Sequence, residues 1–155
     1  SIPNRESLIV PSLGAVYAAL RDYAHPVLRM MMGLVFVPHG MQKLFGALHA
    51  PPLEGSVKFF GAMGTWANSS AWVYYIGALE FFGGVCLAAG FLTRVVAIQF
   101  VGFMLMAAFV ANWPRGWFWT AGGSELPLTW AALCFVFVVH GGGKWSVDRA
   151  LGREF

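Results

Sequence analysis

Four long apolar runs, separated by polar connections, limit what this 155-residue chain can fold into. They cover residues 27–45, 72–92, 95–111 and 126–142. A helix of about 20 apolar residues crosses the hydrocarbon core of a bilayer, and the first three runs reach or approach that length. Only 11% of the residues are charged, whereas soluble domains carry about 25%. The sequence therefore predicts an all-α integral membrane four-helix bundle, a single membrane domain over residues 1–155.

Two shorter helices are expected outside these runs. In residues 12–24, Leu13 and Leu20 belong to a set of apolar side chains that recur at helical spacing. This pattern predicts a helix that lies on the inner membrane surface before the first span. The connection between the first two spans is expected to contain a short interfacial helix that carries Phe59 and Phe60.

The distribution of lysine and arginine predicts how the bundle is oriented. Seven of these residues fall on the side of the termini and three on the opposite side, so both termini are expected to be cytoplasmic. The seven are Arg5, Arg21, Arg29, Arg94, Lys144, Arg149 and Arg153. Tryptophans concentrate in the two connections of the outer side, as an aromatic belt at the membrane surface would require.

Polar residues inside the apolar runs mark a candidate site. With a rise of 1.5 Å per residue, His39 lies roughly 18 Å from the inner edge and Glu80 roughly 12 Å from the outer edge. In a core of about 30 Å these two depths coincide. Gln42 and Lys43 follow His39 by three and four residues, so they share its face of the helix. A cluster of Glu80, His39 and Lys43 is therefore expected in the outer half of the bundle.

The energetic cost of an isolated charge favours this cluster. A charge at mid-bilayer costs at least about 2.5–3.5 kcal/mol, so Glu80 should be paired, hydrated or protonated. We favour a polar pocket in the bundle interior. Two alternatives remain: Lys43 extends to the outer headgroups, or Glu80 and His39 form a structural hydrogen bond without chemistry.

Other cofactors and partners find little support in the sequence. Cys86 and Cys134 differ in depth by roughly 8 to 9 Å, and no paired CxxC motif is present. His39 and His140 differ in depth by roughly 8 Å, which does not suit a single haem. No metal, haem or flavin is expected. The net charge of +3 does not predict nucleic-acid binding.

Three stretches between Leu28 and Leu151 carry a family resemblance: "LRMMMGLVFVPHGMQKLFG", "GALEFFGGVCLAAGFLTRVVA" and the closing "HGGGKWSVDRAL". Through them the chain resembles the DoxX family of small four-span bacterial membrane proteins. It implies a helical bundle in the bacterial cytoplasmic (inner) membrane. Some relatives are described as subunits of quinone-linked oxidoreductases, which implies a membrane redox role.

The resemblance and the polar residues together predict an accessory subunit of a respiratory or redox complex, with a quinone pocket between the first two spans. His39 and Glu80 are the candidate catalytic groups. His39, Gln42, Lys43, Glu80, Phe82 and Trp113 are the candidate quinone-binding residues. The electron donor is expected to be another membrane or redox protein subunit, and membrane lipid is the other expected partner. The alternative is a non-catalytic anchor or scaffold for a larger membrane complex.

Overall fold

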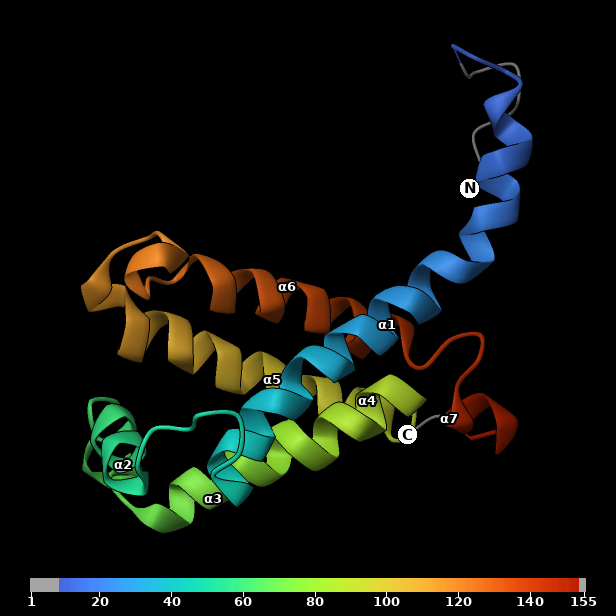
Figure 1. Cartoon of the computed structure of the whole chain (residues 1–155). Helices are drawn as coiled ribbons and strands as arrows, with labels where there is room; N and C mark the ends of the chain where they lie inside the picture. Colours follow the sequence, from blue (N-terminus) through green and yellow to red (C-terminus); the bar gives the residue numbers. More distant parts are fainter. Residues whose placement is uncertain (1–8, 154–155) are drawn as a thin grey trace.

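The computed structural model describes residues 9–153, and all of their regular structure is helical. Figure 1 shows the arrangement of the elements. In chain order they are α1 (Leu13–Phe45), α2 (Leu53–Gly61), η2 (Thr65–Ala67), α3 (Ser70–Ala78), η3 (Leu79–Gly83), α4 (Gly84–Ala89), α5 (Thr93–Met106), η4 (Ala107–Asn112), η5 (Trp113–Arg115), η6 (Trp119–Ala121), α6 (Glu125–His140) and α7 (Val147–Ala150).

The long helices pack side by side (Figure 1). The C-terminal part of α1 packs on the continuous rod α3–η3–α4, and α5 packs on α6. By length and composition, two described stretches are able to cross a membrane: Ser70–Ala89 and Thr93–Arg115. The shorter α6 is also apolar. The four predicted runs are thus all helical; three begin and end within a few residues of the predicted bounds, and the first is the C-terminal part of α1, whereas the crossing of a membrane by all four stays a prediction.

Small residues allow α1 to approach the second rod closely. A Cβ atom at Gly40 would overlap the backbone nitrogen of Phe81, and one at Gly33 would overlap the backbone of Gly84 and Ala88. Such contacts between helix backbones are typical of membrane helix pairs, where dispersion replaces the hydrophobic effect as the driving force. The pattern of glycines therefore brings Gln42 and Lys43 of α1 beside the middle of the second rod.

Two π-helical turns interrupt the long rods. In η3 and η4 the hydrogen-bond ladder accommodates one extra residue, which rotates the following side chains about the helix axis. Glu80 lies in η3, and Asn112 is the last residue of η4. The local helical register therefore changes where these polar residues occur.

A buried polar network holds the turn between α4 and α5. Arg29 of α1 is fully buried and donates from Nη1 to the carbonyls of Leu87 (2.6 Å) and Ala88 (2.7 Å), near the C-terminal end of α4. Asp148 of α7 accepts from the backbone N–H groups of Leu92 (2.8 Å) and Thr93 (2.9 Å) at the start of α5. A cation thus caps helix carbonyls and a carboxylate caps helix N–H groups, in agreement with the helix dipoles.

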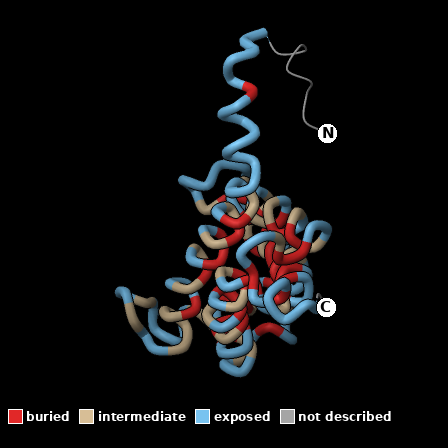
Figure 2. Tube along the Cα trace, turned by 90° about the vertical axis from the view of Figure 1, so that its right-hand side faces the viewer, coloured by how far each residue is buried: buried red, intermediate tan, exposed pale blue. Residues whose placement is uncertain are grey.

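The N-terminal part of α1 differs from its prediction. An interfacial helix over residues 12–24, separate from a span over residues 27–45, was expected, but α1 is continuous through both. Pro26 lies inside the helix, where it removes only one backbone hydrogen bond and permits a bend. Residues 13–24, hereafter the arm, turn away from the bundle and are almost entirely exposed (Figures 1 and 2).

The short helix predicted between the first two runs is present as α2. Phe60 of α2 is buried and packs near Phe103 of α5, with ring centroids 6.3 Å apart. This contact attaches α2 to the end of the bundle opposite the arm (Figure 1). The position of α2 at a membrane surface stays a prediction.

Candidate ligand-binding site

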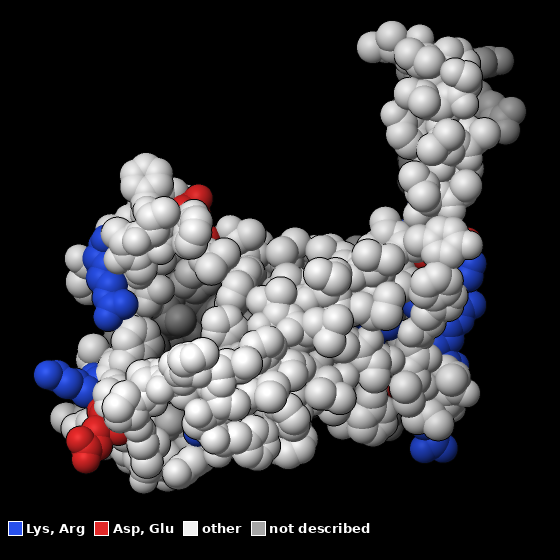
Figure 3. All heavy atoms as spheres, viewed as in Figure 1, with Lys and Arg blue, Asp and Glu red and all other residues white. Residues whose placement is uncertain are grey.

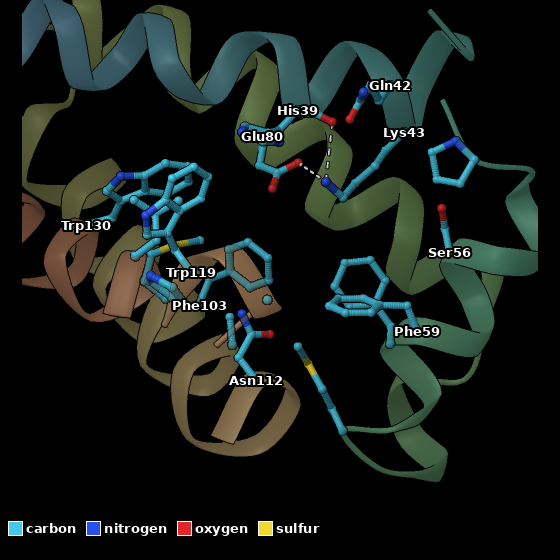
Figure 4. A pocket seen from close by; sticks show the side chains of 18 of the residues that line it. His39, Gln42, Lys43, Ser56, Phe59, Glu80, Phe103, Asn112, Trp119 and Trp130 are labelled. Carbon is cyan, nitrogen blue, oxygen red and sulfur yellow. Dashed lines mark hydrogen bonds and ion pairs between the residues drawn. The ribbon is translucent and has the colours of Figure 1, made fainter. Parts of the chain in front are cut away.

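A cavity of about 540 Å³ lies at the end of the bundle that α2 covers. Its walls come from α1, α2, η3, α5, η4, η6 and α6 (Figure 4). It is therefore wider than the predicted pocket between the first two spans, because the α5–α6 hairpin supplies one whole side. Four of the predicted residues line it: His39, Gln42, Lys43 and Glu80.

The polar centre of the cavity is an ion pair between α1 and η3. The Nζ atom of Lys43 lies 2.6 Å from Oε2 of Glu80, and the two side chains are only 16% and 6% exposed. Lys43 also donates to the backbone carbonyl of His39 at 3.3 Å. Pairing offsets the cost of burying both charges, which explains how the carboxylate is tolerated in the interior of the bundle. The predicted proximity of Glu80 and Lys43 is thus present, and Lys43 points inward instead of extending to the headgroups.

His39 and Gln42 line the same cavity without contacting the carboxylate. The His39 imidazole faces the indole of Trp130 at a centroid distance of 5.7 Å and an interplanar angle of 60°. Gln42 donates from Nε2 to the carbonyl of Leu48 at 3.2 Å, which ties α1 to the connection before α2. The described structure shows no hydrogen bond between His39 and Glu80, so the ion pair, not a histidine–glutamate bond, is the closest polar contact here.

Aromatic side chains form the apolar walls. They are Phe59 and Phe60 of α2, Phe103 of α5, Trp119 of η6 and Trp130 of α6. The planar rings leave a slot between the α2 side and the α6 side (Figure 4). The space-filling view shows a hollow at this end of the molecule (Figure 3). The cavity can therefore receive a flat apolar group and present it to the ion pair.

Phe82 and Trp113, both predicted to bind the ligand, lie outside the cavity. Phe82 is 59% exposed, because a position two residues after Glu80 falls on nearly the opposite face of the helix. Trp113 is 57% exposed and packs against Phe109, with ring centroids 5.9 Å apart. The tryptophans that face the cavity are instead Trp119 and Trp130.

Asn112 is a site residue that the sequence reasoning missed. Its Nδ2 donates to the carbonyl of Gly123 at 3.3 Å, and its buried Oδ1 has no hydrogen-bond partner among the described residues. A buried acceptor without a partner is unfavourable, so a ligand or water that donates a hydrogen bond here would be stabilised. The polar residue at the end of a long apolar run was the available sequence signal.

The class of protein that these features indicate is a helical membrane protein with an internal ligand site. The features are apolar helices in close contact at glycines and a ligand-sized cavity around a buried ion pair. Within that class, the chain belongs to the DoxX family, whose model, described as DoxX, matches residues 25–113. This range contains His39, Gln42, Lys43, Glu80 and Arg29, and it excludes the arm.

The chain is also similar to two bacterial proteins. The chain is 36% identical to the Bacillus subtilis protein named "Putative oxidoreductase CatD" over 74 residues, and this alignment covers 48% of each chain. It thus aligns with about half the length of that relative. It is 28% identical over 138 residues to the "Inner membrane protein YqjF" of Escherichia coli, which covers 88% of this chain and 98% of the relative. No solved structure matches the chain.

Proposed function

We propose that this protein is a bacterial inner-membrane subunit that binds a quinone headgroup in the cavity beside Lys43 and Glu80 and serves a membrane redox complex. The buried ion pair at the wall of an aromatic slot carries the proposal. The name "Putative oxidoreductase CatD" of one relative supports the redox role, and the name "Inner membrane protein YqjF" of the other supports the location in the inner membrane.

The cavity offers what a quinone requires. Its volume of about 540 Å³ is within the range of small-molecule sites, which hold roughly 300–1,000 Å³. The ring system would lie between Phe59 and Trp130, and the carbonyl oxygens would accept from Lys43 and His39. A quinol hydroxyl would in turn donate to Oδ1 of Asn112, the acceptor that lacks a partner.

The ion pair also offers a route for protons. Reduction of a quinone to a quinol takes two electrons and two protons. The ammonium of Lys43 would donate one proton to a quinone oxygen, Glu80 would take up a proton from water and pass it to the neutral amine, and the second proton would follow the same route. The electrons come from a partner protein in this proposal. This chain contributes the binding slot, the orientation of the ring and the proton relay.

Tryptophan fluorescence tests the proposal, because a quinone quenches nearby indoles. The full-length protein in lipid nanodiscs is titrated with decylubiquinone, and quenching is compared between Trp130→Phe and Trp113→Phe. We expect saturable quenching in the parent, a clearly smaller saturable part in Trp130→Phe, and no change in Trp113→Phe, whose ring lies outside the cavity. Quenching that rises linearly and equally in all three proteins would show only partition into lipid and would refute the site.

A scaffold role is the alternative function. Trp113, Trp117 and Phe118 are 57%, 53% and 68% exposed at the same end of the bundle as the cavity (Figure 1). They therefore offer an aromatic contact surface for another subunit. Absence of saturable quenching and of co-purified quinone, together with loss of a partner on substitution of these rings, would favour the scaffold.

A further inference from the structure

A second cavity, of about 450 Å³, lies where the arm joins the bundle. It is distinct from the quinone cavity, which is at the opposite end (Figure 1). Arg21, Asp22 and His25 line it from α1, and His140 lines it from the end of α6. Lys144 and Arg149 complete it from the C-terminal segment. We call it the joint cavity.

The joint cavity carries an excess of positive charge. Three cations, Arg21, Lys144 and Arg149, face one carboxylate, Asp22. Nζ of Lys144 pairs with Oδ2 of Asp22 at 2.6 Å, so the one acidic group is already engaged. Within residues 9–153, the guanidinium groups of Arg21 and Arg149 form no hydrogen bond or ion pair. Two arginines thus remain available for an anion.

The surroundings of the joint cavity are apolar on the bundle side. Pro26 and Val136 line its wall, and Phe135 and Val139 of α6 are 57% and 55% exposed next to lining residues in the sequence. In a membrane protein such exposed side chains contact lipid tails. Figure 3 shows basic side chains gathered at the end of the bundle from which the arm leaves.

The arm is placed to lie along a membrane surface. It turns across the direction of the bundle helices (Figures 1 and 2) and exposes Leu13, Val16, Tyr17 and Leu20 by 40%, 48%, 51% and 58%. A helix with this exposed apolar set and nearby cations is typical of one that lies in the headgroup region of a bilayer. The joint cavity would then be at the depth of the lipid phosphates.

We propose that the joint cavity binds the phosphate group of an anionic phospholipid, with its acyl chains along α6 and the arm resting in the interface. Arg21 and Arg149 would hold the phosphate oxygens, since a guanidinium donates paired hydrogen bonds to phosphate. A free phosphate would use the same two arginines. The apolar wall and the exposed flank of α6 favour the lipid, because only the lipid covers them.

The experiment measures lipid retention by native mass spectrometry of the full-length protein. The protein, solubilised in a mild detergent, is incubated with dioleoyl phosphatidylglycerol or dioleoyl phosphatidylcholine. Each incubation is done with and without inorganic phosphate at about 10-fold molar excess over the lipid. We expect preferential retention of phosphatidylglycerol that inorganic phosphate does not displace. Since one cation near an anionic lipid surface contributes about 1 kcal/mol, Arg21→Gln should weaken retention about five-fold, and adding Arg149→Gln roughly 25-fold.

The control is a pair of cations at the opposite end of the bundle, Lys58→Gln with Arg115→Gln, which removes the same charge from outside the joint cavity. Melting curves establish that both double variants are folded, which is expected because all four side chains are exposed. Equal loss of phosphatidylglycerol in the two double variants would reduce the effect to net charge and overturn the proposal. Displacement by inorganic phosphate would assign the site to a soluble anion and overturn the lipid. Equal retention of both lipids by the parent would also overturn it.

Discussion

Removal of the Asp148 carboxylate should destabilise the fold strongly. Asp148 is 1% exposed and accepts three hydrogen bonds, from the N–H groups of Leu92 and Thr93 and from the Thr93 hydroxyl at 2.8 Å. In Asp148→Ala these three donors lose their acceptor, and the buried Arg29 loses a nearby negative charge. Breaking a buried charged network by removing one partner costs about 3–5 kcal/mol. For a chain of this size that corresponds to a fall in Tm of roughly 6 to 20 °C.

The measurement is thermal unfolding of the purified protein in detergent, followed by intrinsic fluorescence. Asp22→Ala is the matched control, because it also removes an aspartate from a 2.6 Å ion pair, but one whose carboxylate is 58% exposed. Exposed ion pairs contribute little, so this variant should melt within about 2 °C of the parent. If Asp148→Ala melts as the parent does, or if the two variants lose the same amount, the stabilising role assigned to the buried network is wrong.

Three further predictions address the cavity, the helix contacts and the arm. Lys43→Met should lower the Tm in detergent more than the double variant Lys43→Met with Glu80→Leu, because the single change leaves a buried carboxylate without a cation. Thermal melting of the parent, both single variants and the double variant measures this coupling, and additive losses of stability would contradict it. Gly40→Ala should reduce the yield of folded protein, whereas Gly55→Ala, whose Cβ would meet only Pro51 at 3.9 Å, should not; size-exclusion profiles compare them. The hydrogen bond and charge of Lys144 lower the pKa of the Asp22 carboxyl below its usual 3.8. The contribution of this ion pair to holding the arm on the C-terminal segment is therefore complete above pH 3.8 and is lost as the pH falls through the lowered value. Distances between spin labels on the arm and α7 should increase at that pH, and they should not respond to acid in Asp22→Asn.

Much of the fold follows from periodicity and length along the chain. The apolar runs determined where the helices lie, and the rise per residue placed Glu80 at the depth of His39, one turn from Lys43, with which Glu80 forms the ion pair. These inferences succeed because they depend on one helix at a time and on the thickness of its solvent.

The composition of the cavity walls could not be predicted in the same way. Phe82 and Trp113 were expected beside the ligand and point outward, whereas Trp119, Trp130 and Asn112 face the cavity. Periodicity gives a residue's position along a helix, but the rotation of that helix depends on its neighbours. The π-helical turns η3 and η4 shift that rotation further.

The sequence by itself determined that this chain is helical, suited to lipid and supplied with a polar pair at matching depth, because hydrophobic spacing and helix rise are properties of each segment alone. Only the tertiary structure decided that Arg29 is buried as a clamp on the α4–α5 turn, although its place near the end of an apolar run suggested a charge at the membrane edge. Its partners are the carbonyls of Leu87, Ala88 and Trp145, as many as 116 residues away. Such contacts arise only when separate helices pack, and that packing cannot be read from any single segment.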